Sequence, residues 1–223
     1  MNVDAFQYLH PATDREVRGA CPYPDSLLEP EERGWGNCGI DLYFAGDSIT
    51  RRWGTSDPQY RDFLANWNRN FFGWNAANFG WGSDTVQNIL WRLENGELDG
   101  VHPKVIVLLA GANNVGAKPP PADREEAKAE DITRGIRAVL GVMRQKAPHA
   151  TVILMGLTPN NDRGNTAVMP LINRINERLV RLADGKTVRF LNLNDRLADK
   201  DGKLVEGMTV DGLHLSEMGY QVW

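Results

Sequence analysis

Short apolar runs alternate with longer amphipathic stretches over most of this chain. The runs that read as strands cover residues 40–45, 75–79, 104–110, 151–157 and 188–193. Residues 104–110 (Lys-Val-Ile-Val-Leu-Leu-Ala) form the clearest of them. Such a continuous aliphatic run is typical of a parallel strand that is covered on both faces. The pattern therefore predicts five strands.

Three of the intervening stretches place apolar residues at helical spacing. One covers residues 85–95, and the other two centre on residues 132–143 and 171–182. Their apolar positions are Val86, Ile89, Leu90 and Leu93, then Ile132, Ile136, Val139, Leu140 and Met143, then Leu171, Ile172, Ile175, Leu179 and Leu182. Because strands and helices alternate, we expect an α/β fold, a three-layer α/β/α sandwich with a five-stranded parallel sheet. Ligands of such sheets bind beyond the carboxyl ends of the strands.

Residues 1–39 do not share this alternation. Prolines and glycines interrupt the segment at Pro11, Pro22, Pro24, Pro30, Gly34, Gly36 and Gly39. Since these residues break helices and loosen the backbone, we expect an irregular extension that packs on a domain formed by residues 40–223.

Composition restricts the partners of this domain. The 223 residues include 42% hydrophobic and 24% charged residues, which fits one globular domain. A net charge of −4 predicts neither a nucleic-acid-binding face nor a polybasic membrane patch. The chain has no apolar run long enough to span a membrane and no apolar core of an export signal near its start. An export signal that had been removed would leave no trace, so the location stays open between the cytoplasm and export.

The cysteines and histidines give no sign of a metal or cofactor. Cys21 and Cys38 are either a disulfide pair or free thiols, and we favour free thiols. Neither they nor the histidines have the spacing of a zinc site, so we expect no metal and no cofactor. His10, His102 and His149 each stand beside a proline without a carboxylate nearby at a useful spacing, which indicates structural roles.

Two short motifs carry candidate chemistry. Residues 46–50 (Gly-Asp-Ser-Ile-Thr) follow the first strand, and residues 211–214 (Asp-Gly-Leu-His) lie close to the end of the chain. A serine hydroxyl needs a base to become a nucleophile, and the base needs a third group to orient it. Ser48, His214 and Asp211 supply these roles. The alternatives are that Ser48 only caps a helix and that Asp211 only caps the helix beginning near Ser216.

Two further segments could hold the oxyanion of an acyl-transfer reaction. Residues 78–85 form a glycine-rich turn that opens a helix, and residues 111–114 (Gly-Ala-Asn-Asn) follow the third strand. Oxyanion stabilisation requires N–H donors aimed at the developing charge. We expect these donors to be the backbone N–H groups of Ser48 and of Gly82 or Ser83, together with the side chain of Asn113.

These four segments, called blocks below, are residues 46–50, 78–85, 111–114 and 211–214. With the blocks in this order, the chain resembles the SGNH hydrolases, also called the GDSL esterase/lipase family. Ser48 matches the nucleophile of the family's first block, Asn113 its oxyanion asparagine, and Asp211 and His214 its final Asp-x-x-His. Residues 75–116 look most like the acetylhydrolase branch, which includes the catalytic subunits of platelet-activating factor acetylhydrolase and bacterial acyl-ester hydrolases. The resemblance covers residues 40–223 and implies a flavodoxin-like SGNH hydrolase fold.

The chain departs from the family in two places. The family's glycine donor directly precedes Asp-Thr, where this chain has Ser83, with Gly82 one residue earlier. Ser83 can serve if its φ is not positive, so the donor stays open between the two. The family also continues through a final helix, most of which the chain lacks. We therefore expect exposed apolar surface and a looser segment around Asp211 and His214.

Aromatic residues near the blocks bear on the substrate. Trp53, Trp74, Trp81 and Trp91 lie within or beside the first two blocks, and we expect at least two of them to pack in the core. Trp81 is expected to form a wall of the pocket, and Asp47 is assigned to substrate binding with it. Arg51 and Arg52 would line an anionic or polyol rim.

Together these features predict a serine esterase that acts on short-chain esters through an acyl-enzyme. No lid for long acyl chains is visible, which favours a small pocket and an acetyl group on a small molecule or carbohydrate. A carbohydrate acetylesterase is one such enzyme. Two alternatives are an inactive SGNH-like carbohydrate-binding or scaffolding domain and a lysophospholipase or thioesterase. The acetylhydrolase branch includes dimers, so a homodimer is also open.

Overall fold

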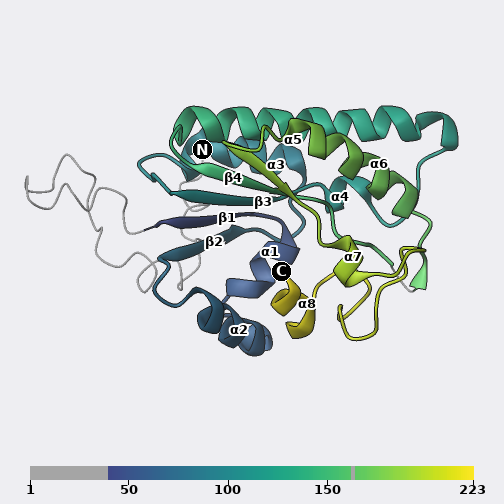
Figure 1. The fold of residues 1–223 in the computed structure, drawn as a ribbon, viewed down its shortest axis with the longest axis horizontal. Helices are drawn as coiled ribbons and strands as arrows, with labels where there is room; N and C mark the ends of the chain where they lie inside the picture. Colours follow the sequence, from purple (N-terminus) through teal and green to yellow (C-terminus); the bar gives the residue numbers. More distant parts are fainter. Residues whose placement is uncertain (1–39, 162–163) are drawn as a thin grey trace, which may run out of the picture.

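The computed structural model of this chain describes residues 40–161 and 164–223 (Figure 1). The expectations for the extension of residues 1–39, and for His10, Cys21 and Cys38 within it, lie outside the described residues.

The core of the fold is a five-stranded sheet in which every neighbouring pair of strands is parallel, in the order β2-β1-β3-β4-β5. The strands are β1 Leu42–Gly46, β2 Ala76–Gly80, β3 Val105–Leu109, β4 Thr151–Met155 and β5 Val188–Leu191. Each lies at an apolar run that predicted it, with ends that differ by at most two residues. The chain pairs β2 with one side of β1 and β3 with the other, so the sheet has a switch point at the carboxyl end of β1.

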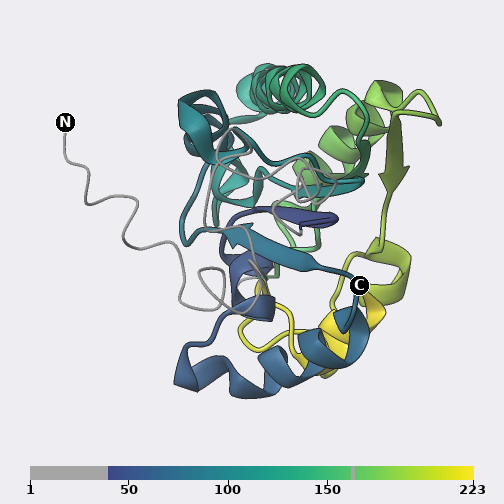
Figure 2. The same ribbon diagram turned by 90° about the vertical axis from the view of Figure 1, so that its left-hand side faces the viewer.

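Helices cover both faces of this sheet, as Figures 1 and 2 show. One layer consists of α3 Val86–Arg92, α5 Glu125–Lys146 and α6 Met169–Leu179, and the other of α1 Ser48–Gly54, α2 Arg61–Phe71 and α8 Glu217–Val222. Shorter elements are η5 Pro58–Tyr60, the π-helical turn η6 Leu93–Glu97, α4 Ala112–Val115, η7 Ala122–Arg124, η9 Val180–Leu182 and α7 Asn194–Leu197.

Alternate residues of β3 divide the core between the two layers. Ile106 and Leu108 belong to the cluster under α3, α5 and α6, whereas Val107 and Leu109 belong to the cluster under α1, α2 and α8. Side chains of a strand point alternately to opposite faces, so an unbroken aliphatic run fills both clusters. The predicted three-layer α/β/α sandwich is thereby confirmed.

Aromatic rings fill the core on the α1 and α2 side. Phe44 and Trp53 pack edge to face with the rings of Trp67 and Phe71 from α2, a helix that the sequence analysis missed. Our prediction that at least two of four tryptophans would be core residues is wrong. Only Trp53 is buried, while Trp74, Trp81 and Trp91 are 61%, 39% and 60% exposed because they lie on turns or on outward faces.

The last described helix, α8, is held against α1. Tyr220 is fully buried, its ring stacks on Trp53 with 5.1 Å between centroids, and its hydroxyl donates to the Ile49 carbonyl at 2.6 Å. Gly219 lies so close to the preceding loop that a Cβ there would be 2.3 Å from the Met208 carbonyl oxygen. The segment before α8, which carries Asp211 and His214, is therefore brought beside the start of α1.

Candidate active site

The candidate site lies where three neighbouring strands end. Gly46 at the end of β1 is in register with Gly80 of β2 and with Leu109 of β3. The Trp81 N–H continues this pairing by donating to the Gly46 carbonyl at 3.1 Å. The loops that follow β1, β2 and β3 therefore begin at one edge, and they carry Ser48, the 81–85 turn and Asn113.

Glycine at the end of β2 lets α1 approach the sheet closely. A Cβ on Gly80 would lie 2.3 Å from the backbone nitrogen of Arg51 and 2.8 Å from the carbonyl oxygen of Asp47. Real Cβ atoms do not approach backbone atoms this closely, so no larger residue fits without moving α1. Close contact between α1 and β2 fixes the first turn of the helix, where Ser48 lies.

Ser48, His214 and Asp211 form a hydrogen-bonded chain. The Ser48 Oγ is 2.9 Å from His214 Nε2, and His214 Nδ1 is 2.7 Å from Asp211 Oδ2. The other oxygen of Asp211 accepts the backbone N–H groups of Leu213 at 3.1 Å and His214 at 2.8 Å. These bonds fix the carboxylate and the imidazole within one turn, with the second ring nitrogen directed at the serine.

Neither helix-capping alternative describes this arrangement. Asp47, not Ser48, caps α1, because its Oδ1 accepts the backbone N–H of Ile49 at 2.9 Å. Ser216, not Asp211, caps α8 by accepting the N–H of Gly219 at 3.2 Å. Ser48 and Asp211 are thus left for the contacts with His214.

Burial and charge keep the imidazole ready to accept a proton. Burial lowers the pKa of His214, the hydrogen bond to Asp211 raises it in part, and the positive charge of Arg52 lowers it again, so the net pKa is below the ordinary value. Burial raises the pKa of Asp211, but hydrogen bonds from His214 and Leu213 more than offset this and hold it below its usual range. At neutral pH the pair is therefore a neutral imidazole beside a carboxylate.

The turn after β2 contains a strained serine. Ser83 has a φ of +66°, the left-handed region that favours glycine, and its neighbour Gly82 is not in that region. The condition under which we expected Ser83 to replace the family's glycine without strain is therefore not met. The choice between Gly82 and Ser83 as oxyanion donor stays a prediction.

Asn113 and Asn114 bind this turn to the loop after β3. Asn113 Nδ2 donates to the Asp84 carbonyl at 2.8 Å, and Asn114 Oδ1 accepts the Val86 N–H at 2.8 Å. A side-chain amide has two N–H groups, so Asn113 keeps a second donor for another acceptor. The structure thus brings the predicted oxyanion segments into direct contact.

A buried ionic cluster behind the turn was not predicted as part of the site. The Arg92 guanidinium pairs with Asp84 at 2.7 Å and also with Glu97, and it reaches the Gly46 carbonyl at 3.5 Å. Arg92 therefore joins the end of β1 to the turn that contacts Asn113. Arg92 and Glu97 both lie within residues 90–98, part of the segment that resembles the acetylhydrolase branch, and this resemblance is the sequence signal that could have indicated the cluster.

Asp47 does not lie where a substrate could touch it. Asp47 is only 1% exposed. Its Oδ1 atom caps α1, and its Oδ2 atom has no hydrogen-bond partner. The assignment of Asp47 to substrate binding is therefore wrong, because the carboxylate points into the protein. Burial, together with nearby Asp84, raises its pKa to about 7 despite the N–H of Ile49.

Trp81 and the two arginines lie beside the nucleophile's helix. The Arg51 guanidinium stands over the Trp81 ring at 5.1 Å and pairs with Asp57 at 3.0 Å. Arg52 pairs with Asp211 at 3.6 Å. Trp81 keeps enough exposed surface to act as a wall, and that role stays a prediction.

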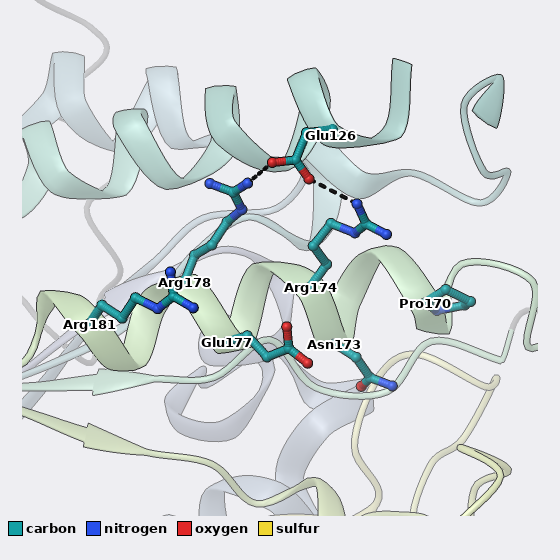
Figure 3. A pocket seen from close by; sticks show the side chains of 7 residues that line it. All are labelled: Glu126, Pro170, Asn173, Arg174, Glu177, Arg178 and Arg181. Carbon is teal, nitrogen blue, oxygen red and sulfur yellow. Dashed lines mark hydrogen bonds and ion pairs between the residues drawn. The ribbon is translucent and has the colours of Figure 1, made fainter. Parts of the chain in front are cut away.

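A separate groove of roughly 300 Å³ lies between α5 and α6 (Figure 3). It is lined by Glu126, Pro170, Asn173, Arg174, Glu177, Arg178 and Arg181. Arg174 and Arg178 both pair with Glu126, so much of its charge is internally compensated. It contains none of the predicted site residues. Within residues 40–161 and 164–223, no cluster of His, Cys, Asp and Glu is arranged to hold a metal ion.

Comparison with known proteins agrees with this geometry. A model of the GDSL-like Lipase/Acylhydrolase family matches residues 44–222, which include Ser48 and His214. The chain belongs to the GDSL-like Lipase/Acylhydrolase family. It is accordingly a carboxylic ester hydrolase, as the sequence blocks predicted.

Individual proteins resemble most of the chain in sequence or in fold. The human platelet-activating factor acetylhydrolase IB subunit alpha1 is 37% identical over 184 residues, covering 81% of this chain and 70% of its own. A GDSL-like lipase from Bacteroides thetaiotaomicron has a TM-score of 0.63 at 22% identity, with 88% and 87% of the two chains covered. An acetyl-xylooligosaccharide esterase from Geobacillus has a TM-score of 0.57 at 16% identity, with 82% and 90% covered. These two structures share the fold.

Proposed function

We propose that this chain hydrolyses short-chain acyl esters, acetyl esters above all, through a Ser48–His214–Asp211 triad and an acyl-enzyme. The observation that carries the proposal is the chain of contacts from Ser48 Oγ to His214 Nε2 at 2.9 Å and from His214 Nδ1 to Asp211 Oδ2 at 2.7 Å. The first contact lets the imidazole take the proton of the serine hydroxyl, and the second lets the carboxylate orient the imidazole.

The first half of the reaction forms the acyl-enzyme. His214 Nε2 takes the hydroxyl proton as Ser48 Oγ bonds to the ester carbonyl carbon, and Asp211 stabilises the imidazolium. The carbonyl oxygen becomes an oxyanion that accepts from the N–H groups of Ser48 and of Gly82 or Ser83, and from the Asn113 amide. When the carbon–oxygen bond of the ester breaks, His214 returns its proton to the leaving alcohol.

The second half returns the enzyme to its starting state. Water gives a proton to His214 Nε2 and attacks the acyl carbon, and the same donors hold the second oxyanion. The bond to Ser48 Oγ then breaks, the carboxylic acid leaves, and the serine recovers its proton from His214. Each proton removed is returned, so the net reaction consumes one water.

The acyl group is inferred from related proteins and from the environment of the serine. Relatives include acetylhydrolase subunits and an acetyl-xylooligosaccharide esterase, both named for acetyl groups. Trp81, 39% exposed beside Arg51, offers a flat apolar surface of the kind that contacts a sugar or a small alcohol. We rank acetylated carbohydrates first and small or lipid-derived acetyl esters second.

Hydrolysis of p-nitrophenyl acetate, butyrate and octanoate by the full chain and by Ser48→Ala tests this function. We expect acetate to be the best substrate and Ser48→Ala to lose at least about a thousandfold in kcat. Ser56→Ala, which removes an exposed serine shortly after α1, serves as the control and should retain activity. Ordinary turnover by Ser48→Ala would overturn the proposal. Carbohydrate binding without turnover, and without labelling of Ser48 by a fluorophosphonate, would favour the binding-domain alternative.

A further inference from the structure

Arg52 connects the helix of the nucleophile to the turn of the base. It lies one helical turn after Ser48 on α1, and its Nη1 is 3.6 Å from Asp211 Oδ2. This is the same carboxylate oxygen that His214 Nδ1 contacts at 2.7 Å. Arg52 thus faces the triad carboxylate from a different element than the one that carries Asp211.

The two partners of this ion pair differ in exposure. The Asp211 side chain is 45% exposed, whereas that of Arg52 is 22% exposed. The Arg52 guanidinium carbon lies 5.3 Å from the centroid of the Tyr60 ring, so the last residue of η5 packs against the guanidinium. An ion pair this exposed adds little to overall stability. The two backbone N–H groups that bind Asp211 contact its other oxygen, so Arg52 and His214 are the groups at Oδ2 in the described part of the chain.

The charge of Arg52 also acts on the imidazole. The charged and titratable groups that face the His214 ring in the described structure are Asp211 from its own turn and Arg52 from α1. Tyr60 supports Arg52, and buried Asp47 lies at the start of the same helix. Burial lowers the pKa of His214, Asp211 raises it, and Arg52 lowers it. A positive charge here opposes a second one on the ring.

We infer that Arg52 is a positioning residue of the triad: its guanidinium, beside Asp211 Oδ2, holds the carboxylate in line with His214. The inference rests on the proposed esterase function. The arginine stabilises the geometry in which Nε2 faces Ser48 and keeps the base in its neutral form toward lower pH. The planar guanidinium suits both tasks, since it stacks on Tyr60 and presents fixed N–H groups to the carboxylate.

Steady-state kinetics of Arg52→Gln and Arg52→Lys across a pH series test this role. For Arg52→Gln we expect kcat to fall on the order of tenfold with KM little changed, because a displaced base slows chemistry more than binding. The acidic limb of kcat/KM should move to higher pH, since the opposing charge is gone. Arg52→Lys keeps the charge, so its acidic limb should stay in place while kcat falls by less. Arg134→Gln, which removes an exposed arginine of α5, is the control for net charge.

Independent readouts separate this role from folding and from substrate contact. Thermal melts establish that each variant folds, and Arg52→Met, which keeps the aliphatic stem over Tyr60, replaces Arg52→Gln if that variant does not fold. The rate at which a fluorophosphonate labels Ser48 should follow the same pH shift. The inference would be overturned if Arg52→Gln, or Arg52→Met in its place, kept both the wild-type kcat and the wild-type acidic limb of kcat/KM. A rise in KM alone would overturn it as well. A wild-type chain that neither hydrolyses esters nor reacts with the fluorophosphonate would overturn the proposed function as well.

Discussion

The conformation of one residue, Ser83, distinguishes this site from what the motifs alone predict. The sequence showed that serine replaces glycine before Asp-Thr, but it could not show that φ here is +66°. The turn takes this value because the backbone must pass from β2 into α3 while Asp84 stays within reach of Arg92 and Asn113. Tertiary contacts, and not the local preference of serine, decide the backbone.

Replacing Ser83 by glycine should therefore stabilise the protein. A left-handed non-glycine residue costs about 1 kcal/mol, so we expect Ser83→Gly to raise the free energy of unfolding by about that amount in urea titrations. Ser83→Ala keeps a Cβ in the same conformation and is the matched control, with no gain expected. Equal stabilisation by both variants would show that the strain is not the cause.

Asp47 should make stability depend on pH. Its folded pKa of about 7 lies above the ordinary aspartate pKa of 3.8, so between these values the folded state holds a proton that the unfolded state releases. The free energy of unfolding therefore falls as pH rises from about 4 to about 7, by on the order of 4 kcal/mol from this group. Asp47→Asn keeps an oxygen for Ile49 and lacks the charge.

This variant should be more stable than the parent above pH 7 and lose that advantage near pH 4. Urea unfolding at several pH values measures the difference. Asp131→Asn, at an exposed position on α5, should keep the slope of the parent. A slope unchanged by Asp47→Asn would contradict the raised pKa.

At the scale of elements, the fit of α1 against β2 depends on glycine. Gly80→Ala would place a Cβ 2.3 Å from the Arg51 backbone nitrogen. We expect a loss of about 3 kcal/mol in unfolding free energy and a lower kcat, because α1 must move and Ser48 begins it. Gly141→Ala is the matched control, since that glycine is in α5 with nothing within 4 Å of an added Cβ.

The control should change stability in the opposite direction. Alanine in an open helix interior is favoured over glycine by up to about 1 kcal/mol, so Gly141→Ala should unfold at higher denaturant with unchanged activity. Parallel losses in both variants would indicate a general intolerance to substitution and not a close approach of α1 to β2.

Strands were predictable from the sequence, whereas the 11-residue helix α2 was not. An apolar run predicted each strand, most clearly for β3, which is buried on both faces, and less clearly for the edge strand β5, where Arg189 and Leu191 are exposed. Residues 61–71 also place Phe63, Trp67 and Phe71 at helical spacing. The asparagines and aromatic residues among them are weak helix formers, so local propensity masked α2. Packing of its rings against Phe44 and Trp53 supplies the stability that propensity does not.

At the scale of the whole molecule, two buried tyrosines lie in the clusters on opposite sides of the sheet. The hydroxyl of Tyr220 donates to the Ile49 carbonyl at 2.6 Å and ties α8 to α1. The hydroxyl of Tyr43 is equally buried but has no hydrogen-bond partner. A satisfied buried hydroxyl stabilises, whereas an unsatisfied one costs free energy.

Removing the two hydroxyls should therefore have opposite effects. We expect Tyr220→Phe to lower the free energy of unfolding by about 1 kcal/mol and Tyr43→Phe to leave it unchanged or raise it by a similar amount. Thermal or urea unfolding of both variants measures this. A stabilising Tyr220→Phe would show that the bond to Ile49 does not hold α8 in place.

The residues of the candidate site that belong to short motifs could be predicted from the sequence. Contacts between segments that are far apart along the chain could not. Ser48, Asp211 and His214 follow from short motifs, because the chemistry needs those residue types at those spacings. The pairing of Arg52 with Asp211 crosses from α1 to a turn far along the chain. Such a contact depends on how the last segment docks, and no local pattern encodes it.

The distance along the chain between Ser48 and His214 has a consequence for synthesis. Ser48 lies directly after β1, whereas its proposed base, His214, is made 166 positions later. Until that position has been made, a nascent chain carries the serine without its proposed base. Under the proposed mechanism, ester hydrolysis begins only after the segment that carries His214 has docked beside α1, so activity reports the docking of that segment.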